Sequence, residues 1–235
     1  MEIKVMSYNV QHFENFKTGE IDFDSYSEYI KNADIIGLNE VRGEYKSTAA
    51  PSQAETIAAK TGYNLYYAEA IQFDGKDSYG NALLSKYPII RTEKFPIPSP
   101  PPEDFPDYWV EDRCLLKAEI DVCGTIVNVF VIHFGLSPVE AQRAADAVKK
   151  YVKGEKVILM GDFNLTPEKP IIADIRKMLN DTADKFDEAK LSFPSDKPDR
   201  KIDYMLVSDD IKIISADIPD KVLSDHRPYI SVLDI

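Results

Sequence analysis

The sequence has 235 residues, and 44% of them are hydrophobic, which is enough for a sizeable core. A formal net charge of −12 argues against tight non-specific binding to duplex DNA or anionic membranes, because such binding needs clustered lysine and arginine. No stretch approaches the roughly 18 apolar residues of a membrane span. The N-terminus enters a strand pattern without a signal-peptide pattern, so we expect a cytoplasmic protein.

Short runs rich in β-branched and aromatic residues, bounded by turn residues, predict eleven strands. In chain order they are Ile3–Asn9, Asp34–Glu40, Tyr63–Ala70, Gly80–Ser85, Ile89–Ile97, Arg113–Val122, Thr125–His133, Lys156–Asp162, Ile202–Ser208, Ile211–Asp217 and Tyr229–Leu233.

Capping signals predict helices between these strands. Ser137 as N-cap, Pro138 at the first position and Glu140 at the third open one helix, which Gly154 ends. The other predicted helices run from Ser52 to Gly62, over Asp22–Lys31 and over Pro170–Leu179. Strands of this number with helices interposed indicate two packed sheets with helices outside, in one domain over residues 1–235.

A proline-rich stretch and the two cysteines also allow predictions about local structure. Pro96–Pro106 is rich in proline and acidic residues and predicts a long surface loop beside the site. Tyr108 and Trp109 follow that stretch and are candidate exposed aromatic contacts. Cys114 and Cys123 lie in apolar runs, so we expect two buried free thiols.

Gly161-Asp162-Phe163-Asn164 follows the apolar run Lys156–Met160, which predicts a buried strand. The glycine permits close backbone approach, the aspartate can accept a proton from water, and the asparagine can orient a phosphoryl group. Alone, this tetrapeptide is more often an ordinary turn than a catalytic motif.

Polar clusters also mark the ends of other predicted strands, and each one alone is consistent with a turn. They are Ser7-Tyr8-Asn9, Asn39-Glu40, His133-Phe134-Gly135, Lys201-Ile202-Asp203-Tyr204 and Ser224-Asp225-His226. Together they supply carboxylates, amides and histidines, the residue types suited to hydrolysis at phosphorus with an oxygen-ligated metal.

This set resembles the endonuclease/exonuclease/phosphatase superfamily, and the matching stretches cover the whole chain in the family's order. They are Ser7–Val10, Ile36–Val41, Tyr79–Ile89, Val131–Leu136, Leu159–Asn164, Lys201–Tyr204 and Ser224–His226. The resemblance implies an α/β fold, a four-layer αββα sandwich of two packed mixed β-sheets flanked by helices. It places the site at one edge of the two sheets.

The resemblance also implies residue roles. Glu40 resembles the principal ligand of Mg²⁺, with Asn9 and Asp225 as further ligands or supports, and a hard oxygen sphere suits Mg²⁺ or Mn²⁺. Catalytic roles fall on the residues Asp162 (water activation), Asn164 (phosphate contact), His226 (phosphate contact), Asp203 (orientation of His226) and His133 (proton donor to the leaving oxygen).

Three further positions bear on the comparison with the family. Asn39 stands where the family more often has glutamine. Arg113, in Glu111-Asp112-Arg113, is a candidate substrate contact, with an ion pair as the alternative, and Asn81 is a second candidate substrate contact.

The predicted function is divalent-metal-dependent hydrolysis of a phosphodiester, with a nuclease or a head-group phosphodiesterase as the open choices. The acidic charge favours a small or single-stranded substrate over duplex DNA. A phosphomonoesterase of the inositol-phosphate type and an inactive binding scaffold are the alternatives. A serine hydrolase is disfavoured, because Ser224 and His226 share one short segment and no Gly-x-Ser-x-Gly elbow is present. No obligate protein partner is evident.

Overall fold

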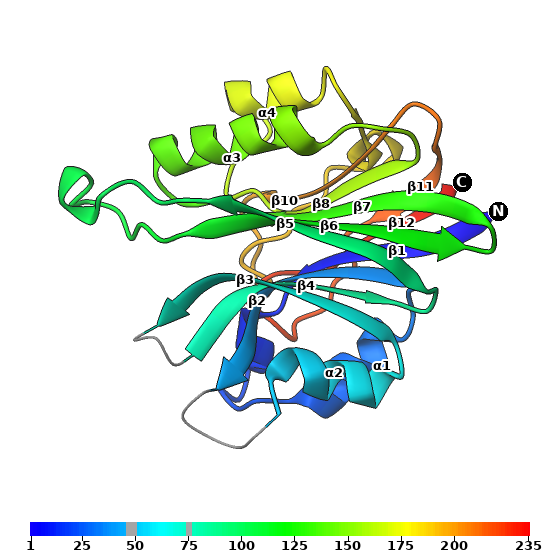
Figure 1. The fold of residues 1–235 in the computed structure, drawn as a ribbon, viewed down its shortest axis with the longest axis horizontal. Helices are drawn as coiled ribbons and strands as arrows, with labels where there is room; N and C mark the ends of the chain where they lie inside the picture. Colours follow the sequence, from blue (N-terminus) through cyan, green and yellow to red (C-terminus); the bar gives the residue numbers. More distant parts are fainter. Residues whose placement is uncertain (46–50, 74–76) are drawn as a thin grey trace.

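The computed structural model describes residues 1–45, 51–73 and 77–235, which form two packed six-stranded sheets (Figure 1). Across the first sheet, the order is β11 (Lys212–Asp217), β12 (Tyr229–Asp234), β1 (Glu2–Asn9), β2 (Ile35–Tyr45), β4 (Asp77–Ser85) and β3 (Asn64–Phe73). Across the second, it is β5 (Ile89–Ile97), β6 (Arg113–Val122), β7 (Thr125–His133), β8 (Val157–Asp162), β10 (Asp203–Val207) and β9 (Asn180–Asp181).

Helices cover the outer face of each sheet (Figure 1). The first sheet carries α1 (Phe23–Ile30) and α2 (Gln53–Thr61), and the second carries α3 (Pro138–Tyr151) and α4 (Pro170–Ile175). Short 3₁₀ turns are η1 (Gln11–Phe13), η2 (Pro102–Asp104) and η3 (Thr182–Lys185). The arrangement confirms the predicted four-layer αββα sandwich.

The predicted helix caps are present. The Ser137 hydroxyl accepts a hydrogen bond from the Glu140 backbone amide, and the Glu140 carboxylate accepts one from the Ser137 backbone amide, which completes a capping box at α3. Ser52 caps α2 in the same way, and Gly62 ends that helix at a φ of 75°, where glycine is unstrained.

Apolar faces of both sheets pack together in the middle of the sandwich, and this core includes Val5, Ile35, Val131, Ile158 and Met205. In each sheet, two adjacent strands are parallel: β1 with β2, and β7 with β8. Parallel neighbours end at the same edge of a sheet, so polar residues that follow these strands gather there.

All eleven predicted strands are present, but β2 does not end at Glu40 as expected. It continues to Tyr45, and its pairing with β4 shifts register between Leu38 and Val41. Glu40 occupies this bulge with a φ of 62°. A bulge redirects one side chain, and strand pairing resumes beyond it. The polar residue Glu40 therefore marks a bulge within β2 and not the end of the strand.

Three smaller expectations also differ. Cys123 is exposed, because it lies in the tight turn between β6 and β7, whereas Cys114 is buried as predicted. The helix α4 ends at Ile175 and continues only as turns toward Leu179. The two-residue strand β9 was not predicted, because it is too short to carry a pattern.

Among the residues that the structure describes, no helix is both long enough and apolar enough to span a membrane.

Candidate active site

Three neighbouring strands of the second sheet bring catalytic candidates into one row. The β-register pairs His133 of β7 with Asp162 of β8, and Asp162 with Asp203 of β10. Gly161 makes this possible: its φ is 147°, and an added Cβ would lie 1.8 Å from the Ile132 carbonyl oxygen. Only glycine allows β8 to approach β7 so closely at this point.

Amides from the first sheet join this row across the sandwich. Asn9 Nδ2 donates to Glu40 Oε1 at 2.9 Å and to Asp162 Oδ2 at 3.1 Å. Asn39 Oδ1 accepts from the Asp162 backbone amide at 2.9 Å, and its Nδ2 donates to the Ile132 carbonyl at 3.1 Å. The two sheets are therefore fixed to each other at the site edge by buried hydrogen bonds.

The oxygen Oδ2 of Asp162 is the point on which three side chains converge. Besides Asn9, His226 Nε2 lies 3.5 Å from it and His133 Nε2 lies 3.6 Å from it. Asp162 is almost fully buried, and burial raises the pKa of its carboxyl to about 7 despite the nearby His226. A carboxylate with such a pKa can exchange a proton near neutral pH.

His226 is held by the carboxylate that the sequence assigned to it. Its Nδ1 lies 2.9 Å from Asp203 Oδ2, which confirms the predicted contact. Burial lowers the pKa of His226, but the Asp203 and Asp162 carboxylates outweigh burial and raise that pKa to about 10. His226 is therefore an imidazolium at neutral pH, with Nε2–H directed toward Asp162.

His133, in contrast to His226, is neutral. Arg113 Nη1 lies 3.2 Å from His133 Nδ1, and since a guanidinium only donates, Nδ1 is the acceptor and Nε2 carries the proton. Burial, and secondarily Arg113 and His226, hold the pKa of His133 well below its usual range. His133 can thus donate a hydrogen bond from Nε2 but carries no positive charge.

Asn164 lies beside both residues, at a φ of 51°. Its backbone amide donates to Asp162 Oδ1 at 2.8 Å, and its Nδ2 donates to the Phe134 carbonyl at 3.0 Å. Nδ2 is also 3.2 Å from His133 Nε2, and because both nitrogens are donors in this tautomer, that approach is a contact without a hydrogen bond.

Glu40 and Asp225 are the two carboxylates that we expect to hold a hard cation. Burial raises the pKa of Glu40, and the Asp225 carboxylate raises it further, so a shared cation would relieve both burial and repulsion. Asn9 belongs to the same cluster, although its Oδ1 accepts from the Gln11 amide at 3.1 Å while its nitrogen faces the two carboxylates. In this orientation, Asn9 positions Glu40, and its role as a direct ligand stays a prediction.

A second donor set consists of Asp162, Asp203 and His226, whose potential ligand atoms lie within 4.8 Å of one another. His226 Nδ1 and Asp203 Oδ2 already bond each other. The expected division of roles, with proton transfer by this set and a cation held by Glu40 and Asp225, stays a prediction.

Arg113 and Asn81, the two candidate substrate contacts, have different surroundings in the structure. Arg113 is buried and pairs with Glu111 at 2.6 Å, so the alternative of an ion pair holds, although the pair lies inside the protein and beside His133. Asn81 accepts from Asn39 and donates to the Cys114 carbonyl, which uses both ends of its buried amide. The predicted substrate contact by Asn81 is therefore not supported.

Sequence reasoning missed two residues that shape this site. Asn39 was considered only as a departure from a pattern, yet its amide joins the two sheets at Asp162. Glu111 holds Arg113 and, through its backbone amide, bonds Glu140 Oε1 at 3.1 Å. The position of Asn39 directly before Glu40 was an available signal. The pairing of Glu111 with Arg113 could be read from their closeness in the sequence, but the bond of Glu111 to Glu140, 29 positions away, had no local signal.

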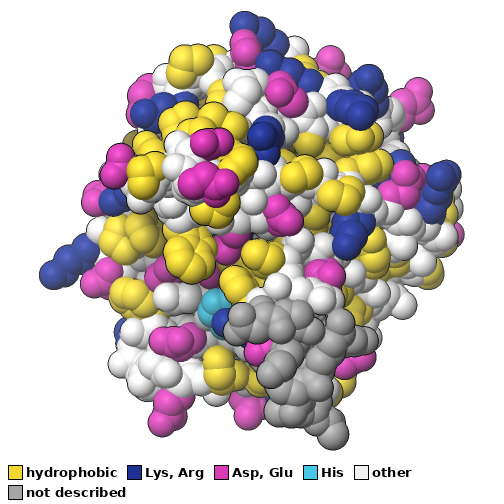
Figure 2. Space-filling model, turned by 60° about the vertical axis from the view of Figure 1, so that its left-hand side comes forward, with side chains coloured by type: hydrophobic (Ala, Val, Ile, Leu, Met, Phe, Trp, Pro, Cys, Tyr) yellow, Lys and Arg dark blue, Asp and Glu magenta, His cyan; other side chains and the backbone are white. Residues whose placement is uncertain are grey.

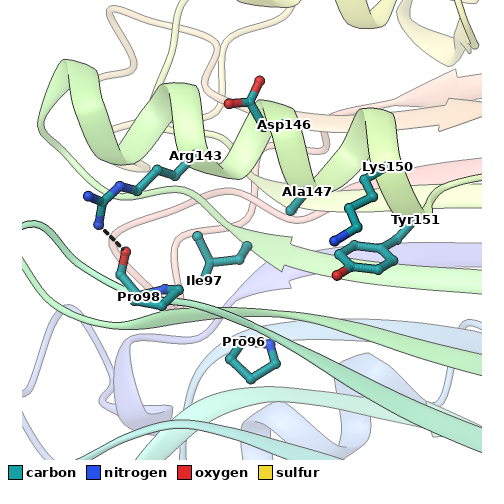
Figure 3. A pocket seen from close by; sticks show the side chains of 8 residues that line it. All are labelled: Pro96, Ile97, Pro98, Arg143, Asp146, Ala147, Lys150 and Tyr151. Carbon is teal, nitrogen blue, oxygen red and sulfur yellow. Dashed lines mark hydrogen bonds between the residues drawn. The ribbon is translucent and has the colours of Figure 1, made fainter.

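On the face shown in Figure 2, apolar, acidic and basic side chains are interspersed. A separate groove of about 460 Å³ lies between α3 and the segment that begins in β5, lined by residues such as Ile97, Arg143 and Tyr151 (Figure 3). It contains none of the catalytic candidates.

Comparisons with known proteins bear on the fold and the family of this chain. No curated protein matches the chain. A *Leptotrichia buccalis* endonuclease/exonuclease/phosphatase family protein is 17% identical, with a TM-score of 0.78 over 99% of this chain and 100% of that one. A *Bacteroides thetaiotaomicron* mannosyl-6-phosphatase is 17% identical, with a TM-score of 0.76 over 99% and 100%.

A *D. rerio* TDP2, solved with a single-strand DNA product, is 14% identical, with a TM-score of 0.71 over 100% of this chain and 99% of that one. These likenesses show the fold. The sequence model of the Endonuclease/Exonuclease/phosphatase family matches residues 6–226, nearly the whole chain. The chain therefore belongs to the endonuclease/exonuclease/phosphatase family.

Proposed function

We propose that the protein is a Mg²⁺- or Mn²⁺-dependent phosphodiesterase that hydrolyses its substrate by in-line attack of water. The observation that carries the proposal is the convergence of Asn9, His133 and His226 on Asp162 Oδ2, at 3.1, 3.6 and 3.5 Å. Family members are phosphoester hydrolases that use divalent metals. The eight residues expected to act together all lie in the described part of the chain.

In this proposal, Asp162 accepts the proton of the attacking water, because its pKa of about 7 lets it act as a base near neutral pH. His226, which is charged, offsets negative charge on the phosphoryl oxygens and can deliver a proton to the leaving oxygen, the role that the resemblance implied for His133. His133 donates a hydrogen bond from Nε2 without a charge.

Glu40 and Asp225 would hold the metal, which when bound supplies a Lewis acid for the phosphoryl oxygens. Asn9 keeps Glu40 in place through its 2.9 Å bond. Buried positioning of this kind lets charge stabilisation act without reorganisation.

The test is hydrolysis of bis-p-nitrophenyl phosphate with Mg²⁺ or Mn²⁺, beside EDTA and the variant Asp162→Asn. We expect metal-dependent turnover that the variant reduces to near background, with circular dichroism unchanged. Full activity in EDTA, or wild-type turnover in Asp162→Asn, would contradict the proposal.

The same assay on p-nitrophenyl phosphate addresses the alternative of a monoesterase, because that substrate has only one ester bond. Activity on the monoester alone would replace the phosphodiesterase proposal. Absence of activity on both, with intact metal binding, would favour the inactive scaffold.

A further inference from the structure

The segment between β5 and β6, residues 98–112, extends beyond the ends of the two sheets (Figure 1). We call it the rim loop. Both of its ends are fixed to helix α3. Arg143 Nη1 donates to the Pro98 carbonyl at 2.7 Å (Figure 3), and the Glu111 backbone amide donates to Glu140 Oε1 at 3.1 Å. The base of the loop therefore has a defined position relative to α3.

The rim loop presents two aromatic side chains to solvent. Trp109 is 70% exposed and Tyr108 is 44% exposed. An indole left in water forgoes the large apolar burial that tryptophan gains in a core. A large exposed aromatic side chain on an anchored loop is therefore a surface available for a ligand.

Trp109 is linked to the catalytic centre by three successive contacts. Its Nε1 donates to Glu111 Oε2 at 3.1 Å, and Glu111 Oε1 pairs with Arg113 Nη1 at 2.6 Å. Arg113 Nη1 lies 3.2 Å from His133 Nδ1. The exposed ring is thus held by the same buried ion pair that contacts His133 and fixes its tautomer.

Arg113 offers a second observation at this place. Its side chain is only 6% exposed, yet its Nε has no hydrogen-bond partner in the described part of the chain. A buried guanidinium N–H without a partner is costly, and an anionic group bound beside it would satisfy it.

We propose that Tyr108 and Trp109 form a subsite for a flat aromatic ring that the substrate carries beside its scissile phosphate. The ring is either the base of an unpaired nucleotide or an aryl group on the ester. The location of the phosphate rests on the proposed function. Stacking contributes affinity without positive charge, which suits a protein with a net charge of −12.

Binding can be measured directly, because Trp109 is the single tryptophan of the chain. Its fluorescence is titrated with AMP, with phenyl phosphate and with ribose 5-phosphate, which lacks an aromatic ring. The titrations use the Asp162→Asn variant with Mg²⁺, so that turnover does not interfere.

We expect AMP to quench the fluorescence and to bind about tenfold or more tightly than ribose 5-phosphate, as one stacked base provides. If phenyl phosphate binds as tightly as AMP, an aryl ring is sufficient for the subsite. If only AMP binds more tightly than ribose 5-phosphate, the subsite recognises a nucleobase. Equal affinity for AMP and ribose 5-phosphate overturns the proposal.

Variants separate stacking from the bond to Glu111. By calorimetry, Trp109→Ala should lose the preference for AMP, whereas Trp109→Phe, which keeps a ring without an N–H, should retain most of it. Ile126→Ala is the control, since Ile126 is 40% exposed at the opposite end of β7 from His133. An unchanged preference in Trp109→Ala sinks the subsite.

Failure of the proposed function is distinguishable from failure of the subsite. A clear preference for AMP without hydrolysis of any ester removes the function and keeps the subsite. Hydrolysis of phosphodiesters with no preference for a ring removes the subsite and keeps the function.

Discussion

At the scale of single residues, the site contains two histidines whose environments separate their protonation states. The carboxylates of Asp203 and Asp162 raise the pKa of His226 to about 10, while burial and Arg113 lower that of His133. Groups whose pKa values are driven apart can serve as charged and neutral donors in one reaction. His226 is therefore the candidate for charge stabilisation, and His133 for a neutral hydrogen bond.

Replacing His226 tests this division. His226→Ala should lower kcat about a hundredfold, as expected on losing a preorganised donor to the transition state. Asp203→Asn should keep the imidazole but remove the main charge that raises its pKa. The imidazolium of His226 should then lose its proton at a lower pH than in the wild type. The alkaline limb of the pH–rate profile, where activity falls as pH rises, should therefore move to lower pH.

The measurement is kcat against pH for the wild type and both variants, on the diester used above. Arg227→Gln, a neighbour whose guanidinium pairs with Asp220, is the control for disturbance of the local segment. A loss below threefold in His226→Ala, or an alkaline limb unmoved in Asp203→Asn, would contradict the assigned roles.

The acidic pair at the edge of the first sheet makes a separate prediction about metal binding. Glu40→Gln retains the size of the side chain but removes the charge, so the affinity for Mg²⁺ or Mn²⁺ should fall about tenfold or more, ~1.4 kcal/mol. Calorimetric titration without substrate measures this. Glu2→Gln, at the other end of the first sheet from Asn9, should leave the affinity unchanged. Unaltered affinity in Glu40→Gln would remove it from the ligand set.

At the scale of elements, the site depends on how closely β7 and β8 approach each other. Their parallel pairing sets His133 opposite Asp162, and Gly161 faces Ile132 one step earlier. The glycine has no Cβ to collide with the neighbouring backbone, so the catalytic register and the packing of the sheet depend on one residue.

Gly161→Ala should therefore lower the free energy of unfolding by at least about 3 kcal/mol, since the new Cβ meets a backbone oxygen that cannot rotate away. Urea unfolding followed by circular dichroism measures this. Gly62→Ala is matched to it, because Gly62 also has a positive φ, of 75°, but no atom within 4 Å of the added Cβ. It should cost only about 1 kcal/mol. Equal losses of unfolding free energy in the two variants would mean that backbone strain, and not the close approach of β7, is the reason for glycine at position 161.

The elements show which parts of the fold a sequence can predict. Local signals were sufficient for the strands and for the caps of α2 and α3, because a capping box and an apolar run are each contained in a few residues. The bulge at Glu40 was not predictable in this way, since it depends on pairing with β4, about forty residues away.

The difference between local signals and distant contacts also explains which parts of the site could be predicted and which could not. Each candidate at a strand end was visible because a polar residue follows an apolar run. The bond between Asn39 and Asp162 joins residues 123 positions apart, and the ion pair of Arg113 becomes informative only beside His133. One domain over residues 1–235, a cytoplasmic location and the metal identity stay predictions.

At the scale of the whole molecule, the charge distribution limits how a substrate can be held. The chain has 40 acidic residues against 28 lysines and arginines. Arg113, whose guanidinium contacts His133, is already neutralised by Glu111. Long-range attraction of a polyanion is therefore weak, and affinity has to come from contacts at the site itself.

This predicts weak binding of duplex DNA. In fluorescence anisotropy with a labelled 20-base-pair duplex and no divalent metal, we expect a Kd of about 10⁻⁴ M or weaker at physiological salt, the weak limit of non-specific binding. The logarithm of affinity should also change little with the logarithm of salt concentration, because few phosphates are neutralised and few counterions are released. The single strand of the same sequence is the matched ligand, since it has unpaired bases available for stacking. Micromolar binding of the duplex with a steep salt dependence would mean that a local basic surface outweighs the net charge, and the preference for small or single-stranded substrates would then be wrong.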